Sequence, residues 1–552
     1  MQTRTSGMAV VMIVLGSLAA PYGSWSQTKP ALPSSLAASA QELENQQRWL
    51  EAAQLYVELL AIEPEQSVWQ EALRRCLLQE RIRQRYRDPT VRQLVRNWKL
   101  TQALAAYEEF VRLVEQVFVD NVAADHLWRR GCEQLMWALA NWAYSELAFT
   151  ANPTAAQLDK LRSMLDMESR HPPLDPGELS SHLRLLAQRA ALYAPIRPTA
   201  VVWEFLAASC ESVDAYGAYV TPTGLVLEKM LSEDKWAGVG LSVSAGESGA
   251  LITAVVPESE AQRLGVVPGS RLIRINGELT RSLSTEEIML RLLGQPDSSV
   301  ELEIVYPEGT QKTVSLTRKH VTLATVTEAT LLDSMMGIGY VRVAQFQRHT
   351  VLELDRVLQE LKQRGLRVLI LDLRGNPGGS VRAALELADR FIPEGVLVRT
   401  HGRLPELNAE YSARREDDWH LPVIVLVDEN TASAAEMAVG AIQAHAHTGR
   451  ITAAVVGRPT RGKGVLQHLV PLAEGQAGAA CLTVARWLTP AGTSISPQGI
   501  QPDVLVKPLT PLAHESMMDL DMMPMSNMET SVESVAWQAA LRKAIQLCCE
   551  QP

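Results

Sequence analysis

The spacing of apolar residues predicts a helical region over residues 37–195. The segment 48–64, RWLEAAQLYVELLAIEP, places its apolar side chains on one face at helical spacing and stops at Pro64. Residues 99–116 carry a related pattern, but no period of 34 residues is sustained along the region. We therefore favour a helical bundle whose apolar faces form its core over a peptide-binding repeat array.

From Trp236 onward, short apolar runs separated by glycine turns predict β-structure. Residues 237–280 predict strands, with a Pro-Gly turn before the segment LIRING. Further on, a strand at 337–346, an amphipathic helix at 352–365 and the buried strand LRVLILDL follow in order. Strand, helix and strand in this order are typical of a crossover unit.

A second buried strand, LPVIVLVDE at 421–429, leads to Ser433 at the start of the helix 433–446. The serine therefore lies at the carboxyl end of a core strand and at a helix N-terminus, where backbone N–H groups favour developing negative charge. Taken alone, a serine in this position is most often a helix cap. A lysine such as Lys463, in the glycine loop GRPTRGKGVLQ, is most often a solvated surface charge.

Composition and charge narrow the class of protein. The 552 residues suffice for three or four domains, and 47% hydrophobic with 21% charged residues is typical of a folded protein. A net charge of −10 argues against nucleic-acid binding, which depends on clustered cations. The six cysteines lack the CxxC spacing of metal sites, and we interpret most of them as small buried hydrophobes. We interpret His445 and His447 as loop residues and expect no metal site.

Both ends of the chain carry distinct segments. The N-terminus has the three parts of a secretory signal, namely Arg4, the apolar run 8–20 and the small residues Ser24 and Ser26. Cleavage is predicted after Ser26. The alternative is an uncleaved anchor, which would supply the membrane association of the protein. We therefore expect an exported protein, periplasmic or extracellular. Beyond residue 508, a Met-rich acidic stretch and a final helix predict a linker and a helix that docks on the protein or mediates self-association.

The segment 237–280 resembles a PDZ domain. Residues 265–277 match the turn-and-strand signature of that family, with Ser270 in place of the usual aspartate. The loop that corresponds to the family's carboxylate-binding loop consists of Gly238, Val239, Gly240 and Leu241. The resemblance implies that backbone N–H groups of this loop bind the C-terminal carboxylate of a peptide, while an exposed sheet edge pairs with the peptide strand. A glycine-turned domain that acts only as a spacer is the alternative.

Residues 200–508 as a whole resemble the carboxyl-terminal processing peptidases, a family of serine/lysine proteases with an embedded PDZ domain. The motifs that carry the resemblance stand in family order: DAYGAYVTP at 214–222, Asn376-Pro377-Gly378-Gly379, Thr431-Ala432-Ser433-Ala434-Ala435-Glu436, Gly462-Lys463-Gly464 with Gln467, and GIQPDV at 499–504. Two departures are Arg461, where an aromatic residue is usual, and an extra stretch around HAHTGRITAA, which lengthens the serine-to-lysine spacing.

The resemblance implies a serine-type peptidase without a cofactor, in which Ser433 is the nucleophile, Lys463 the general base and Gln467 the third member. The expected donors of its oxyanion hole are a backbone N–H group of Gly378 or Gly379 and that of Ala434. These residue types suit the chemistry, because a lysine takes a proton from a serine only when it is neutral, which burial or nearby cations favour. The amide oxygen of Gln467 can hold the amine without adding a charge.

The predicted fold class is a multidomain α+β protein with an all-helical N-terminal region, a PDZ-like β domain and a mixed α/β serine peptidase core. The predicted divisions are a signal peptide at 1–26, a helical and weakly tetratricopeptide-like region at 27–195, a first part of the peptidase core at 196–230, a PDZ domain at 231–320, the catalytic core at 321–508, and a linker with a C-terminal helix at 509–552. Such a protein would bind and cleave proteins or peptides with a free C-terminus. The alternative is a peptide-binding scaffold in which the altered region around Arg461 has lost activity.

Overall fold

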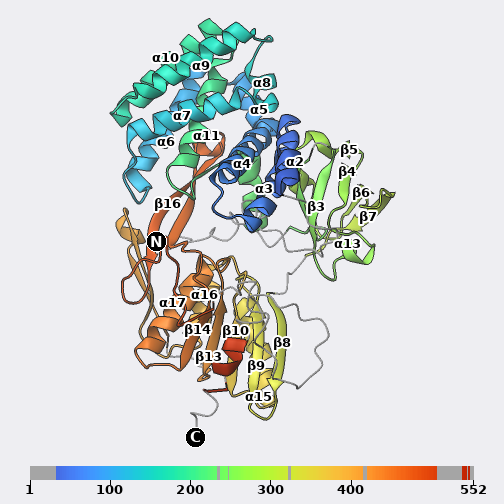
Figure 1. The fold of residues 1–552 in the computed structure, drawn as a ribbon, viewed down its shortest axis with the longest axis vertical. Helices are drawn as coiled ribbons and strands as arrows, with labels where there is room; N and C mark the ends of the chain where they lie inside the picture. Colours follow the sequence, from blue (N-terminus) through green and yellow to red (C-terminus); the bar gives the residue numbers. More distant parts are fainter. Residues whose placement is uncertain are drawn as a thin grey trace. The chain divides into compact units, whose positions relative to one another are not determined.

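The chain forms the predicted α+β protein, with helices first, then a small antiparallel domain and then a mixed α/β core (Figure 1). The structure is a computed structural model and describes residues 33–232, 236–246, 248–320, 325–414, 419–506, 538–543 and 545–546. These residues divide into two compact units, one within 322–468 and 483–552 and the other within 17–321 and 469–482. The predicted signal peptide and Met-rich stretch lie outside the described residues.

The helical region is a bundle around one buried helix. Its helices are α2 (Pro33–Asn45), α3 (Trp49–Ile62), α4 (Ser67–Arg87), α5 (Pro89–Asn97), α6 (Leu100–Val117), α7 (Ala124–Ala138), α8 (Trp142–Ala148), α9 (Ala155–Arg170), α10 (Leu179–Tyr193) and α11 (Pro198–Ser212). The predicted helices at 48–64 and 99–116 correspond to α3 and α6. Helix α11 is buried from Thr199 to Cys210 and packs against α6, α7 and α10.

The motif DAYGAYVTP leads out of this bundle and is fixed to it by one carboxylate. Asp88 is fully buried and caps α5 by accepting the N–H of Thr90 at 2.8 Å. The same carboxylate accepts the hydroxyls of Thr221 at 2.7 Å and Thr223 at 3.0 Å. Residues 221 and 223 therefore anchor the start of α12 (Pro222–Ser232) on the bundle.

The predicted PDZ domain is an antiparallel sheet with a helix beside its edge strand. It contains β2 (Leu241–Ser244), β3 (Ala250–Val255), α13 (Glu260–Arg263), β4 (Arg271–Ile275), β5 (Glu278–Leu279), α14 (Thr285–Leu292), β6 (Ser299–Val305) and β7 (Gln311–Thr317). The strand order is β2-β3-β4-β6-β7, with β5 paired to β4, so β2 is an edge strand. Helix α14 packs against β2 and contributes Ile288 and Leu292 to the domain core.

The α/β core is built on a largely parallel sheet of order β17-β14-β13-β10-β9-β8. Its strands are β8 (Val326–Asp333), β9 (Ile338–Val343), β10 (Val368–Asp372), β13 (Val423–Val427), β14 (Ala453–Gly457) and β17 (Val504–Leu505), and β8 is the antiparallel one. Helix α15 (Thr350–Gln363) joins the parallel strands β9 and β10, which confirms the predicted crossover unit. The other helices are α16 (Val381–Asp389) and α17 (Ala434–His447).

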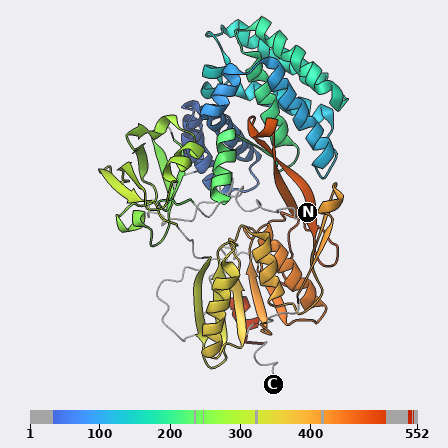
Figure 2. The same cartoon turned by 180° about the vertical axis from the view of Figure 1, so that it is seen from behind.

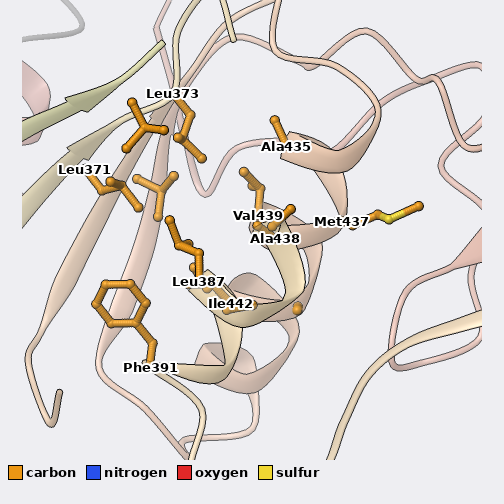
Figure 3. Close-up of a cluster of buried hydrophobic side chains, with 14 of the residues drawn as sticks. Leu371, Leu373, Leu387, Phe391, Ala435, Met437, Ala438, Val439 and Ile442 are labelled. Carbon is orange, nitrogen blue, oxygen red and sulfur yellow. The ribbon is translucent and has the colours of Figure 1, made fainter. Parts of the chain in front are cut away.

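Alternate residues of these strands face two different cores. On one face, Leu371 and Leu373 pack with Leu387 of α16 and with Val439 and Ile442 of α17 (Figure 3). On the other face, Ile338, Ile370, Ile424 and Leu426 form a second cluster that includes Ala540 of the helical segment 538–543. Because Ala540 is buried in this second cluster, the C-terminal helical segment docks on the protein, which is the first of its two predicted roles. Figure 2 shows the core from behind, with α15 in front of the sheet.

A smaller sheet flanks the core and carries the chain that follows Lys463. It contains β11 (Val396–Gly402), β12 (Ala409–Ser412), β15 (Val465–Pro471) and β16 (Ala479–Leu488). Strand β11 pairs with β12 and with residues 485–488 of β16, and β15 also pairs with β16. In the other unit, β1 (Ala218–Val220) pairs with residues 479–481.

The interpretation of the cysteines is met in the described part of the chain. Cys76, Cys132, Cys210 and Cys481 are buried, as expected for small hydrophobic residues, and the other two cysteines lie outside it. None of the helices described is both long enough and apolar enough to cross a membrane.

Candidate active site

Ser433 occupies a strained turn between β13 and α17. We call residues 428–433 the serine turn. Ser433 is half-buried, and its backbone has φ 57° and ψ −121°, a conformation that a residue with a Cβ rarely adopts. Ala434 is the first residue of α17, so the first N–H groups of the helix lie beside the serine. The structure thus places Ser433 at a strand end and a helix start, as the sequence predicts.

The lysine loop, residues 458–464, joins β14 to β15 and packs closely around its glycines. Gly462 has φ 79°, and a Cβ there would lie 2.3 Å from the carbonyl oxygen of Pro497. The carbonyl of Lys463 accepts the indole N–H of Trp487 at 3.2 Å. The lysine itself is half-buried. The glycine therefore allows the close backbone approach that holds the loop in place.

The carboxylate of Glu436 joins the serine turn to the lysine loop. Its Oε2 accepts the backbone N–H of Ser433 at 2.7 Å and that of Lys463 at 2.9 Å. Its Oε1 accepts the N–H of Gly462 and the hydroxyl of Thr460, each at 2.6 Å. One oxygen atom thus binds the main chains of the expected nucleophile and the expected base.

Glu436 is fully buried, and burial raises the pKa of its carboxyl, while its four hydrogen bonds act in the opposite direction. Glu436 stands in the motif around Ser433, but the motif by itself predicts no role for it. A glutamate three residues after a serine at a helix start is the local signal of a capping box. The bonds to Thr460, Gly462 and Lys463 span 24 to 27 residues and leave no local signal.

Arg461 and Gln467 lie on either side of Lys463 in the sequence. The N–H of Arg461 donates to the carbonyl of Thr431 at 3.0 Å, and its side chain is exposed. Gln467 is half-buried on β15. The departure at position 461 therefore leaves a backbone bond between the lysine loop and the serine turn, and it adds an exposed cation two residues from Lys463.

The glycine turn, residues 375–379, holds two of the expected oxyanion donors in different ways. The N–H of Gly378 already donates to the side-chain oxygen of Asn376 at 2.8 Å. The N–H groups of Gly379 and Ala434 have no hydrogen-bond acceptor among the residues that the structure describes. A Cβ on Gly378 would lie 2.9 Å from the nitrogen of Ala434 and 3.0 Å from the Cβ of Ser433. The glycine turn thus packs directly on the serine, with two N–H groups available.

Three hydrogen bonds fix the serine turn to the glycine turn and to Leu373, which precedes that turn. The hydroxyl of Thr431 donates to the carbonyl of Leu373 at 2.8 Å. The N–H of Gly375 donates to Oδ1 of Asp428 at 2.9 Å, and the N–H of Ala432 donates to the carbonyl of Asn376 at 2.9 Å. The two turns follow neighbouring parallel strands, so they meet at the carboxyl edge of the sheet.

The start of the glycine turn is held by an ion pair that no sequence motif predicts. Asp372 is fully buried and binds the Arg374 guanidinium, with Nη2 to Oδ2 at 2.6 Å. The hydroxyl of Tyr340 donates to the same oxygen at 2.9 Å. Burial and then the neighbouring Asp372 raise the pKa of Tyr340, so the tyrosine remains a hydrogen-bond donor.

In the expected carboxylate-binding loop of the PDZ domain, one N–H group already has an acceptor. The N–H of Gly238 donates to the carbonyl of Lys319 at 3.0 Å. In the described parts of the chain, the N–H groups of Val239 and Gly240 have no acceptor. Gly240 has φ 75°, and a Cβ there would lie 2.5 Å from the Cβ of Ser259. Leu241 opens the edge strand β2 and pairs in register with Val255.

His445 and His447 lie at the end of a helix and not in a loop as predicted, and the rest of the extra stretch forms the turn before β14. Both histidines lie in the last turn of α17. His445 is buried, with Nε2 2.8 Å from the carbonyl oxygen of Val396. Nε2 of His447 lies 2.7 Å from Oδ1 of Asp503, in the GIQPDV motif. The described residues contain no cluster of three or more histidine, cysteine or acidic side chains that could hold a metal ion.

Comparisons with known proteins agree with this arrangement. The PDZ domain family matches residues 228–305, and peptidase family S41 matches residues 337–506. A carboxyl-terminal-processing protease of Picosynechococcus sp. is 33% identical over 309 residues, which cover 55% of this chain and 72% of that relative. A protein of the same name from Synechocystis sp. is 36% identical over 277 residues, which cover 49% of this chain.

The C-terminal processing peptidase of Tetradesmus obliquus chloroplasts is 30% identical over 339 residues, which cover 58% of this chain and 69% of that protein. The match to the Synechocystis protein covers 62% of its length, less than two thirds. The matched regions of all three relatives span about half of this chain or slightly more. At these identities and shares, the chain belongs to the family of carboxyl-terminal-processing proteases, within peptidase family S41.

Proposed function

We propose that this chain is an exported serine endopeptidase, periplasmic or extracellular, that binds the C-terminus of a protein and cleaves peptide bonds through Ser433 and Lys463. The observation that carries the proposal is the shared oxygen of Glu436, which accepts the backbone N–H groups of both residues. One buried carboxylate binds the backbones of the serine and the lysine. Such an arrangement suits a nucleophile and its base, because the base must lie within hydrogen-bond reach of the nucleophile.

In the proposed acylation step, the neutral amine of Lys463 takes the proton of the Ser433 hydroxyl while Oγ attacks the scissile carbonyl. The N–H groups of Gly379 and Ala434 stabilise the oxyanion that develops on the carbonyl oxygen. The ammonium of Lys463 then protonates the leaving amine as the peptide bond breaks. The product is an ester between Ser433 and the carbonyl carbon of the substrate, and the new C-terminal fragment departs as a free amine.

In the proposed deacylation step, Lys463 takes a proton from a water molecule, which attacks the ester carbonyl. The second tetrahedral intermediate uses the same two N–H donors, and its collapse returns the proton to Oγ of Ser433. The side chain of Gln467 is the proposed orienting group for the amine. This cycle needs no cofactor, and each step returns the residues to their starting protonation states.

The PDZ domain is the proposed binding site for the substrate C-terminus. Strand β2 is an edge strand, and an extended peptide can pair with such an edge next to α14. The N–H groups of Val239 and Gly240 are the proposed carboxylate donors. The partners are therefore proteins or peptides with a free C-terminus.

The test is to incubate the purified chain with an unfolded protein substrate and to compare it with Ser433→Ala. We expect cleavage by the wild type and none by the variant, while both retain the same circular dichroism spectrum. Labelling with a fluorophosphonate should place the adduct on Ser433. A folded wild type that neither cleaves nor becomes labelled would instead be a peptide-binding scaffold.

A further inference from the structure

Asn376 lies at the centre of the glycine turn and uses all of its polar groups. It is fully buried. Its side-chain nitrogen donates to the carbonyl of Val343 at 2.9 Å, and its side-chain oxygen accepts the N–H of Gly378 at 2.8 Å. Its backbone N–H donates to Leu373 at 3.1 Å, and its carbonyl accepts the N–H of Ala432 at 2.9 Å. The side chain therefore connects the end of β9 to the glycine turn, and the main chain connects that turn to the serine turn.

The peptide group between Gly378 and Gly379 is fixed through its carbonyl, which lies opposite the N–H that has no acceptor among the described residues. The carbonyl of Gly378 accepts the N–H of Phe346 at 2.8 Å, and the carbonyl of Phe346 accepts the N–H of Ser380 at 2.8 Å. In a trans peptide the C=O and the N–H point in opposite directions. The N–H of Gly379 therefore points away from Phe346. A Cβ on Gly379 would lie 2.1 Å from the oxygen of Phe346, which explains the glycine.

The side chain of Asn376 completes this arrangement by holding the N–H of Gly378. An asparagine oxygen that accepts the N–H two residues on forms an Asx turn, which fixes the intervening backbone. Without that acceptor, the N–H of Gly378 would be buried and unpaired unless the turn rotated to find another partner. Gly378 and Gly379 have φ 100° and 122°, and glycines can rotate out of such conformations at little steric cost.

We propose that Asn376 is a positioning residue for the oxyanion site. By holding the N–H of Gly378, its side chain fixes the next peptide group so that the N–H of Gly379 is presented to the reacting carbonyl together with the N–H of Ala434. Asn376 itself does not touch the substrate. This inference rests on the proposed function, because it concerns the stabilisation of the oxyanion in the same reaction.

The test compares Asn376→Ala and Asn376→Ser with the wild type in the full chain. Alanine removes both side-chain bonds, whereas serine retains a short acceptor for the N–H two residues on. The matched control is Ser380→Ala, which removes the α16 cap bond to the N–H of Ala383, 3.2 Å long, one residue beyond the glycine turn. The measurements are kcat and KM on a fluorogenic peptide, and the inhibition constant of a peptide aldehyde of the same sequence.

We expect Asn376→Ala to lower kcat by about 10- to 1000-fold, approaching the loss seen when one oxyanion donor is removed, with KM changed by less than about threefold. The aldehyde forms a tetrahedral adduct, so its affinity should fall in parallel with kcat/KM. Asn376→Ser should lie between alanine and wild type. Ser380→Ala should keep a kcat close to that of the wild type, although its melting temperature falls.

Two results would overturn the inference in different ways. If the wild type is active and Asn376→Ala retains its kcat, or loses thermal stability without losing affinity for the aldehyde, then Asn376 is only structural and the proposed function stands. If the wild type neither cleaves the peptide nor binds the aldehyde, then the proposed function fails, and the positioning role fails with it.

Discussion

Glu436 and Lys463 are 27 residues apart in the sequence and are joined by a hydrogen bond of 2.9 Å from the backbone N–H of the lysine to the carboxylate. The bond involves the backbone of the lysine and not its amine. It fixes instead where the side chain begins. A base that must act over hydrogen-bond distance depends on such placement of its backbone.

Glu436→Gln is expected to lower kcat/KM by about 10- to 100-fold. The amide replaces one carboxylate oxygen by a donor, which then faces the N–H or hydroxyl groups that the oxygen accepted. Each buried group left unpaired costs about 1–3 kcal/mol, so the melting temperature should also fall. The control is Glu429→Gln in the serine turn, where an exposed glutamate pairs with Arg458 at 2.6 Å. If Glu436→Gln and Glu429→Gln were equally active, Glu436 would have no role in positioning the serine and the lysine.

The pH dependence of kcat/KM tests Lys463 as the base. The rate should rise as the amine loses its proton, with an inflection below about 10.4, the value of an unperturbed lysine. Arg461→Glu replaces an exposed cation by an anion two residues away. Because an anion favours the charged ammonium, the inflection should move to higher pH, by less than about one unit in moderate salt.

Lys463→Arg should be inactive at every pH, since a guanidinium does not lose its proton. A pH profile that shifts downward in Arg461→Glu, or an active Lys463→Arg protein, would contradict the assignment of the base.

The carboxylate loop of the PDZ domain is tested by Gly240→Ala. The added Cβ would lie 2.5 Å from the Cβ of Ser259, so the loop must move and KM for substrates with a free C-terminus should rise several-fold. Gly265→Ala is the matched control, because Gly265 has φ 76° and nothing within 4 Å of its added Cβ. Both variants lose stability from the positive φ, but only the first should change KM.

A substrate with an amidated C-terminus should reproduce the defect in the wild type, because amidation removes the charge that the loop binds. Equal cleavage of the free and amidated substrates would leave the domain as a spacer.

Glu353 predicts how the stability of the core depends on pH. Its carboxylate accepts the N–H and the hydroxyl of Thr325, at 2.9 and 2.7 Å, and the N–H of Val326 at 3.1 Å. Burial raises the pKa of Glu353, but these hydrogen bonds and the nearby His349 outweigh it, and the pKa is lowered. The stabilisation is therefore present above the ordinary pKa of a glutamate and is lost as the pH falls through the lowered value.

Urea unfolding of Glu353→Gln should thus show a deficit in unfolding free energy near pH 7 that disappears in acid. Glu360→Gln, an exposed position on the same helix, should show little deficit at either pH. A deficit for Glu353→Gln that stays constant from pH 7 to pH 3 would disprove the linkage.

The sequence predicts the parts of the fold that local patterns encode. The order of β9, α15 and β10 follows from apolar periodicity and from the glycine that ends the helix, and Ser433 is placed because a buried strand runs directly into a helix. The motifs around Ser433 and Lys463 identify the family because several stand in order. Each single pattern or motif lies within about fifteen residues of chain, and only the order of the motifs extends over a longer range.

The N–H groups of Gly238 and Gly378 show what such patterns cannot predict. Each belongs to a motif that normally supplies a carboxylate or oxyanion donor, yet each is bonded, one to Lys319 and the other to the side chain of Asn376. Which of two adjacent N–H groups is free depends on the rotation of one peptide group. That rotation is set by neighbours remote in sequence, such as Lys319 or Phe346.

The backbone conformation of Ser433 lowers the stability of the protein at a position whose side chain the proposed activity requires. With φ 57° and ψ −121°, this position costs a residue with a Cβ on the order of 1–3 kcal/mol, and glycine would relieve most of it. An inactive Ser433→Gly protein should therefore outlast the native one on heating. A scaffold under selection for stability alone would have no reason to keep a β-carbon here, whereas an enzyme must keep it, since the hydroxyl is attached to that carbon.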